Sequence, residues 1–128
     1  MDRDALRVAQ RARRRRFQSR VERVITTLSP EVRDLLDQVV VVVQEEPPLD
    51  ARGDHEDLFG LYQGVPITER GSGYTLALPD QITIFMGPLE RACETRSELD
   101  EQIRITVLHE LGHHLGYDED GLDALGLT

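Results

Sequence analysis

The segment from Thr95 to Gly116 constrains the fold of this chain more than any other, because it is typical of one long helix with both ends marked. Thr95 is followed three residues later by Glu98, which is the spacing of a capping box, and Gly116 is typical of a helix C-terminus. The apolar residues of this segment recur at helical spacing and fill one arc, namely Ile103, Val107, Leu108, Leu111 and Leu115. The predicted helix can therefore pack on a core and still present polar side chains from another arc.

The sequence HELGH at 109–113 lies within this predicted helix. At about 100° per residue, His109 and His113 lie roughly 40° apart and one turn from each other, so their imidazoles can bind a single ion. Glu110 lies about 60° from His113 in projection, close enough to act on a water beside the ion without binding the ion itself. Catalytic zinc requires neutral nitrogen or oxygen donors, one open position and a nearby base. The pattern thus predicts a zinc site with His109 and His113 as metal ligands and Glu110 as the catalytic base.

A third metal ligand is expected just after the helix, where Gly116 allows the chain to reverse toward the ion. Three acidic residues, Asp118, Glu119 and Asp120, stand there. Spacing favours Glu119 as the third ligand, Asp120 competes if the segment forms a helical turn, and Asp118 is a candidate cap for a short segment at 121–125.

The complete pattern, His-Glu-x-x-His-x-x-Gly-x-x-Glu, resembles the long zinc motif of metzincins, with Glu119 where those proteins carry a third histidine. It is more similar to the aspzincin pattern, which ends in aspartate. Over residues 17–127, including the segments 39–43, 58–66 and 78–82, the chain resembles a family of minimal bacterial zincin-like metallopeptidases. The resemblance implies a zinc peptidase in which His109, His113 and an acid at position 119 bind zinc and Glu110 acts as base. The sequence departs from the family in having Glu119 rather than aspartate.

The rest of the chain predicts two helices and about three strands. One apolar helix face begins at Phe17, and Ser29 before Pro30 is typical of the start of a second helix that ends near Asp37. The five valines at 39–43 predict a strand buried on both faces. The segments 58–62 and 82–86 predict two further strands, and we expect 82–86 to be an edge strand that aligns an extended substrate.

These elements predict a single α+β domain at 17–128, with a small mixed sheet of about three strands packed with N-terminal helices and a long C-terminal motif helix. The family resemblance implies that this domain has the minimal zincin-like fold. Residues 1–16 form a separate basic N-terminal arm. Met1–Val24 holds nine arginines against three acidic residues, a net charge of +6, which leaves −15 for the rest of a chain with net charge −9. This acidic remainder disfavours nucleic acid as a partner, so we expect the arm to be solvated or frayed. Alternatively, it contacts acidic surface of its own domain or a neighbour.

The apolar content and the cysteine count exclude several classes of protein. No apolar stretch approaches the roughly 18 residues needed to cross a bilayer, and the polar, arginine-rich start lacks a signal sequence, so we expect a soluble cytoplasmic protein. Cys93 is the only cysteine, which excludes an intrachain disulfide and a thiolate zinc cluster. The partner expected for a peptidase is a peptide or protein substrate. The alternative is a non-enzymatic, metal-stabilised binding module that acts through protein–protein contacts.

Four further residues, three of them outside the motif helix, are not expected to have a catalytic role. His114 projects between apolar positions of the motif helix, so it is expected to be a packed histidine bonded to a backbone carbonyl. His55 is expected to be solvated in an acidic loop. Tyr62 and Tyr74 could bind an oxyanion, but packing is the favoured interpretation.

Overall fold

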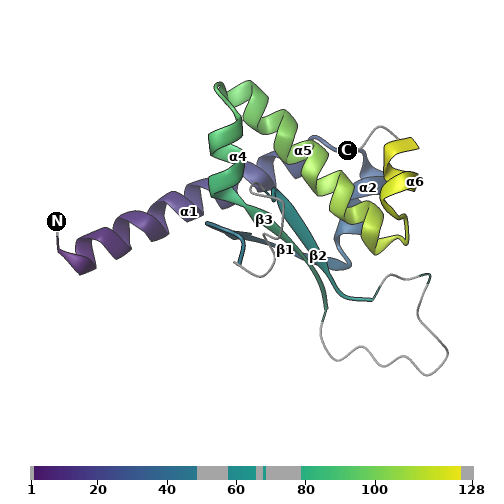
Figure 1. Cartoon of the computed structure of the whole chain (residues 1–128), viewed down its shortest axis with the longest axis horizontal. Helices are drawn as coiled ribbons and strands as arrows, with labels where there is room; N and C mark the ends of the chain where they lie inside the picture. The colour runs from purple at the N-terminus through teal and green to yellow at the C-terminus, as the bar shows by residue number, and fades with distance from the viewer. Residues whose placement is uncertain (1, 49–57, 66–67, 69–78, 125–128) are drawn as a thin grey trace.

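A computed structural model describes residues 2–48, 58–65, 68 and 79–124. Five helices and three strands lie within these ranges (Figure 1). In chain order they are α1 (Arg3–Thr26), α2 (Pro30–Leu36), β1 (Val39–Gln44), β2 (Gly60–Gln63), β3 (Asp80–Phe85), α4 (Met86–Ala92), α5 (Arg96–His114) and α6 (Glu119–Ala124). The chain is a small α+β protein with a mixed sheet, as predicted.

The sheet has the strand order β1-β3-β2, with β3 parallel to β1 and antiparallel to β2. The strand predicted at 82–86 is confirmed as β3, but its assignment as the edge strand is wrong, because β3 is paired on both sides. Its apolar content reflects this central position, since Ile82 and Ile84 are both fully buried. The edge strand that contacts α5 is β2.

The valine-rich strand at 39–43 is confirmed as β1, but the expectation that both of its faces are buried is wrong. Val39 and Val43 are buried, whereas Val40 is 41% exposed. The reason lies in topology, because β1 is an edge strand and only some of its side chains reach the helices that pack on the sheet. The run of five valines therefore predicted a strand correctly, but it did not predict that one face of the strand is partly exposed.

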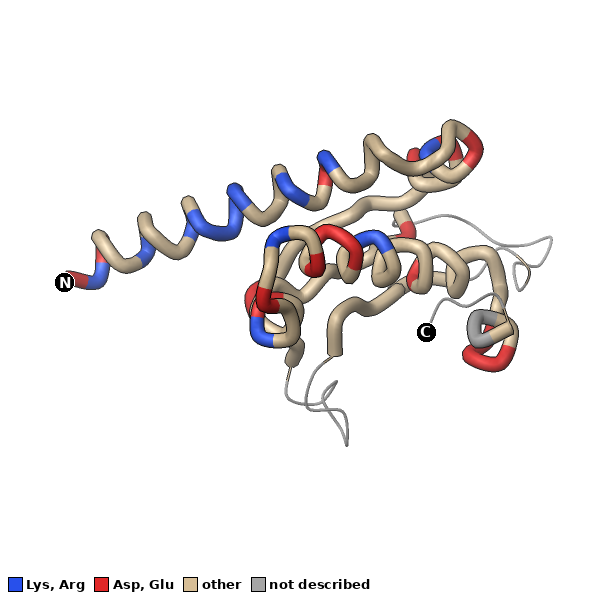
Figure 2. Tube along the Cα trace, turned by 90° about the horizontal axis from the view of Figure 1, so that it is seen from above, with Lys and Arg blue, Asp and Glu red and all other residues tan. Residues whose placement is uncertain are grey.

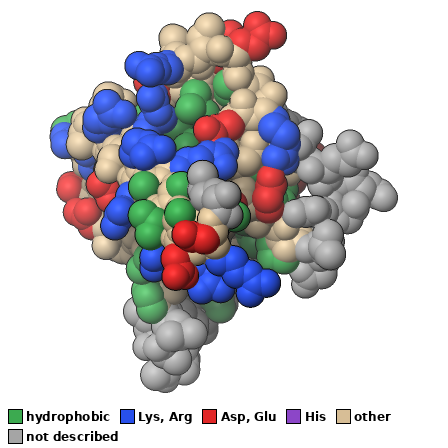
Figure 3. Space-filling model, turned by 90° about the vertical axis from the view of Figure 1, so that its left-hand side faces the viewer, with side chains coloured by type: hydrophobic (Ala, Val, Ile, Leu, Met, Phe, Trp, Pro, Cys, Tyr) green, Lys and Arg blue, Asp and Glu red, His purple; other side chains and the backbone are tan. Residues whose placement is uncertain are grey.

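The first helix begins well before the predicted apolar face, because Asp2 caps it by accepting a hydrogen bond from the Ala5 N–H at 2.7 Å. Burial starts at Phe17, and the preceding part of α1 extends away from the sheet (Figures 1 and 2). Among the described residues, one ion pair joins the predicted arm to the domain, between Arg13 Nη2 and Glu90 Oε1 at 2.6 Å. The side of the molecule seen along α1 carries several arginine side chains, with acidic side chains among them (Figure 3). Although α1 has 24 residues, neither it nor any other described helix is apolar enough over sufficient length to cross a membrane.

The motif helix α5 has both predicted end signals. Thr95 Oγ1 accepts a hydrogen bond from the Glu98 N–H at 3.1 Å, and Glu98 Oε2 accepts one from the Glu94 N–H at 3.1 Å. Gly116 adopts a φ of 99° just after the helix, a conformation that favours glycine, and its N–H donates to His113 O. These caps fix where the last two turns of α5 lie, and those turns carry the histidines.

Candidate metal centre

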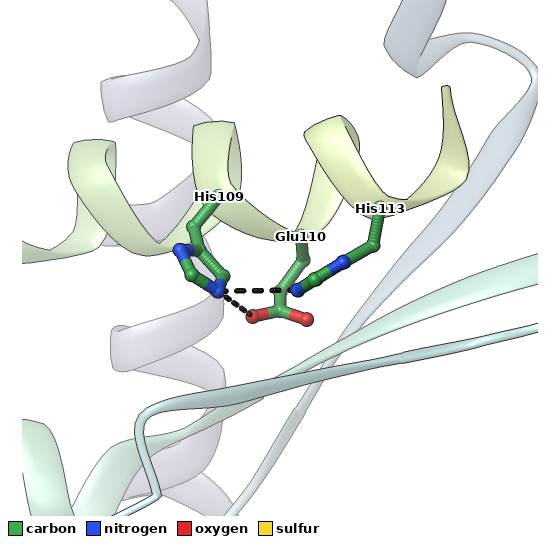
Figure 4. A group of neighbouring side chains, drawn as sticks. All are labelled: His109, Glu110 and His113. Atoms are coloured by element: carbon green, nitrogen blue, oxygen red, sulfur yellow. Dashed lines mark hydrogen bonds and ion pairs between the residues drawn. The ribbon is translucent and has the colours of Figure 1, made fainter. Parts of the chain in front are cut away.

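The last two turns of α5 bring His109 and His113 together beneath the helix (Figure 4). Their Nε2 atoms lie 3.2 Å apart, and the two side chains are 19% and 26% exposed. The backbone carbonyl of Tyr117 lies 3.0 Å from His113 Nδ1 and accepts a hydrogen bond from it. In a neutral imidazole this bond places the proton on Nδ1, so that Nε2, which is directed at His109, can act as a metal ligand.

Glu119, the first residue of α6, reaches back to both histidines. Its Oε1 atom lies 3.3 Å from His109 Nε2 and 2.8 Å from His113 Nε2. The neighbouring Asp118 is engaged differently, since its Oδ1 accepts a hydrogen bond from the Gly121 N–H at 2.8 Å. The structure therefore places Glu119 at the histidine pair and Asp118 at the start of the last described helix, which is the capping position considered from the sequence.

The three converging atoms fit a tetrahedral zinc ion. With Zn–N and Zn–O bonds near 2.0–2.1 Å, neighbouring donor atoms of a tetrahedron lie about 3.3 Å apart. The observed separations among His109 Nε2, His113 Nε2 and Glu119 Oε1 are 3.2, 3.3 and 2.8 Å. Two imidazoles and one carboxylate would supply three donors to a bound zinc ion, which is the number of protein ligands typical of catalytic zinc sites.

Glu110 lies beside the two histidines (Figure 4), and the ligand atoms of these three residues all lie within 4.8 Å of one another. Its Oε2 atom is 3.8 Å from His109 Nε2, farther than the Glu119 oxygen, and its side chain is only 9% exposed. The backbone N–H of Tyr62 in β2 donates a hydrogen bond to it. Burial raises the pKa of the Glu110 carboxyl above its ordinary value, although His109, His113 and the Tyr62 hydrogen bond oppose the rise. A carboxylate that holds a proton more firmly than usual is suited to general acid–base chemistry.

The short strand β2 lies directly against the face of α5 that carries Glu110. A Cβ atom at Gly60 would lie 2.7 Å from Thr106 Cγ2 and 3.2 Å from Glu110 Cγ. Only a residue without a side chain fits this approach, so Gly60 sets the distance between the edge strand and the candidate site.

The expected packing of His114 is confirmed, but its expected partner is wrong. His114 is 1% exposed, and its Nδ1 lies 2.6 Å from Asp80 Oδ2 rather than bonding a backbone carbonyl. Tyr62 is half-buried, consistent with a packing role, and its hydroxyl donates to the same Asp80 oxygen at 2.7 Å. Asp80 was not predicted as a functional residue, although an acidic residue at the start of a buried strand indicates a buried polar interaction. His55 and Tyr74 lie outside the described residues.

A helix with the HExxH spacing, packed on a small mixed sheet and followed by an acidic residue that returns to the histidines, defines a zincin-type centre. The family model of zincin-like metallopeptidases matches residues 36–127, well over half of the chain. The chain belongs to this zincin-like metallopeptidase family. A search of curated proteins gave no match to the chain.

Proposed function

We propose that this protein is a zinc-dependent metallopeptidase that hydrolyses peptide bonds with His109, His113 and Glu119 as metal ligands. The observation that carries the proposal is the convergence of two histidine nitrogens and one carboxylate oxygen at tetrahedral spacing, with Glu110 buried beside them. Membership of the zincin-like metallopeptidase family supports the same reaction class.

In the proposed mechanism, the metal ligands, Glu110 and the Tyr62 N–H have different roles. Zinc bound here would polarise the scissile carbonyl and lower the pKa of water in the site to about 7. Glu110 takes a proton from the attacking water onto its carboxylate and then gives that proton to the leaving amine. The Tyr62 N–H holds the carboxylate in place while it accepts and returns the proton.

The edge strand β2 is the proposed binding strand for an extended substrate. The Phe85 N–H donates a hydrogen bond to Phe59 O. In an antiparallel pair, every second residue of a strand is hydrogen-bonded to its partner strand, so the backbone groups of Leu61 also bond to β3. The backbone groups of Gly60 and Tyr62 then face away from β3. The Tyr62 N–H donates its hydrogen bond to Glu110. The backbone N–H and C=O of Gly60 are therefore the groups proposed to pair with a substrate backbone by β-augmentation.

Exposure at the site favours catalysis over a purely structural metal. The Glu119 side chain is 65% exposed and that of His113 is 26% exposed, so the cluster lies at the surface. Structural zinc sites are closed by four protein ligands, whereas catalytic ones keep a position for water.

The test of the mechanism is the substitution Glu110→Gln, which preserves shape and removes the base. We expect zinc content to be unchanged and peptide hydrolysis to fall by at least about 100-fold. The matched control is Glu101→Gln, the same change at an exposed position on the same helix, which should leave both quantities unchanged. Equal turnover of a cleaved peptide by wild type and Glu110→Gln would contradict the assignment of the base.

The third ligand is tested by comparing Glu119→Ala with Asp118→Ala and Asp120→Ala in zinc titrations against a competing chelator. We expect Glu119→Ala to weaken zinc binding far more than either neighbour, whose charge is screened by salt at this exposed position. If Glu119→Ala binds zinc as tightly as wild type and a neighbour's substitution does not, the ligand is that neighbour.

A further inference from the structure

A buried polar cluster outside the metal centre links the strands to the end of the motif helix. Its centre is the Asp80 carboxylate, 2% exposed at the start of β3, whose Oδ2 atom receives two hydrogen bonds. One comes from the Tyr62 hydroxyl on β2 at 2.7 Å, and the other from His114 Nδ1 on α5 at 2.6 Å. The rings of Tyr62 and His114 also meet edge to face, with centroids 5.7 Å apart. We call Tyr62, Asp80 and His114 the buried clamp.

Two members of the buried clamp connect directly to the proposed catalytic groups. Tyr62 holds Asp80 through its side chain and Glu110 through its backbone N–H. His114 follows His113 on the final turn of α5, so the bond to Asp80 also fixes the turn that carries a proposed metal ligand. One carboxylate thereby ties the edge strand and the helix end to the central strand.

The chemistry of the clamp exceeds what packing alone requires. A buried carboxylate costs several kcal/mol to desolvate unless its oxygens are hydrogen-bonded, so an apolar residue at position 80 would fill the space at lower cost. His114 Nε2 is also buried, and it has no hydrogen-bond partner in the described part of the chain. Gly64 lies directly against the buried clamp, because a Cβ atom at this position would collide with the Asp80 carboxylate and lie 2.9 Å from the Tyr62 hydroxyl.

We propose that Tyr62, Asp80 and His114 are positioning residues, which hold the Tyr62 backbone N–H against Glu110 and the final turn of α5 in the geometry that metal binding needs. The part of this proposal that concerns metal binding by the final turn of α5 rests on the proposed function, whereas the part that concerns the Tyr62 N–H does not. The short β2 has four residues, so its side-chain anchor on Asp80 adds a specific register to its pairing with β3. A hydrogen-bonded partner that orients a functional group typically contributes 10–100-fold in metal affinity or activity.

The test uses the full chain with Tyr62→Phe, which removes only the hydroxyl, and Asp80→Asn, which removes the charge. The first readout is the amide proton of position 62 by nuclear magnetic resonance in metal-free protein, followed by its exchange rate. The second is zinc affinity against a competing chelator, together with the absorption spectrum of the cobalt-substituted protein. The matched control is Ile103→Val, a mildly destabilising change at a buried position of α5 about three helical turns before His114.

We expect both clamp variants to shift the position-62 amide and speed its exchange at least about 10-fold, whereas the control does not. Zinc affinity should fall about 10-fold in Asp80→Asn with a changed cobalt spectrum. If Asp80→Asn does not fold, Tyr62→Phe still decides the first part. An unchanged amide in the folded variants overturns the clamp's link to Glu110, and unchanged zinc affinity and cobalt spectrum in folded Asp80→Asn overturn its link to the ligand turn. Absence of zinc binding by wild type would overturn the proposed function while leaving the amide result valid.

Discussion

The substitution Gly60→Ala probes the contact between the edge strand and the motif helix. The new Cβ atom would lie 2.7 Å from Thr106 Cγ2, about 1 Å inside the usual carbon–carbon contact of 3.5–4.0 Å. It would also lie 3.2 Å from Glu110 Cγ and 3.2 Å from the Thr83 carbonyl oxygen. A small shift of the strand away from Thr106 would therefore not relieve all three close contacts. We therefore expect β2 and α5 to be pushed apart at the candidate site.

The magnitude follows from two opposing effects. Overpacking of a well-packed contact costs about 1–3 kcal/mol, whereas replacing glycine by alanine stabilises by about 0.4–1 kcal/mol through the unfolded chain. The backbone of Gly60 does not have positive φ, so no additional strain is expected. The net loss is about 1–2 kcal/mol, which lowers the melting temperature by about 4–8 °C in a domain of this size.

The assay is urea unfolding of the single variants and of the double variant with Thr106→Ser. This second change removes Cγ2 and keeps the hydroxyl, which donates to Gln102 O at 2.7 Å. We expect Thr106→Ser to restore at least half of the stability lost by Gly60→Ala, a coupling of about 0.5–1 kcal/mol. Wild-type stability for Gly60→Ala, or additive effects in the double variant, would refute the close-packing explanation.

Two further predictions concern the arm and the base. Deleting residues 2–16 should change the free energy of unfolding by less than about 1 kcal/mol in a denaturant titration, because the arm's known link is the exposed Arg13–Glu90 pair; a larger loss would show a docked arm. Glu110→Gln should stabilise metal-free protein at neutral pH, where the raised pKa of Glu110 means that its ionised form disfavours folding. This gain should shrink as pH falls through the raised pKa of Glu110 in the folded protein and should be absent below the unfolded value of about 4.3. Thermal melts across pH that show no such trend would contradict the prediction.

The parts of this protein that depend on local sequence could be predicted. Capping signals fixed both ends of α5, and β-branched runs located β1 and β3. The helical period brought His109 and His113 together, and the structure places Glu119 beside them at hydrogen-bonding distance.

The parts that depend on pairing between distant segments could not be predicted. Strand order is not encoded in any one strand, so β3 was assigned to an edge although it is central. The partner of His114 lies 34 residues earlier in the chain, at Asp80. The helix α4 was not predicted, because Gly87 and Pro88 follow the predicted strand at 82–86 directly and are typical of a turn. A proline in the first turn of a helix is nevertheless well tolerated.

The zinc content of the purified full-length chain tests the central claim most directly. Metal-free protein would be reconstituted with zinc at neutral pH, desalted and measured by elemental analysis beside His109→Ala. The proposed centre supplies two imidazoles and one carboxylate at tetrahedral spacing, so wild type should retain about one zinc per chain and His109→Ala should retain almost none. Wild-type protein that retains no zinc, or equal retention by His109→Ala, would contradict the account.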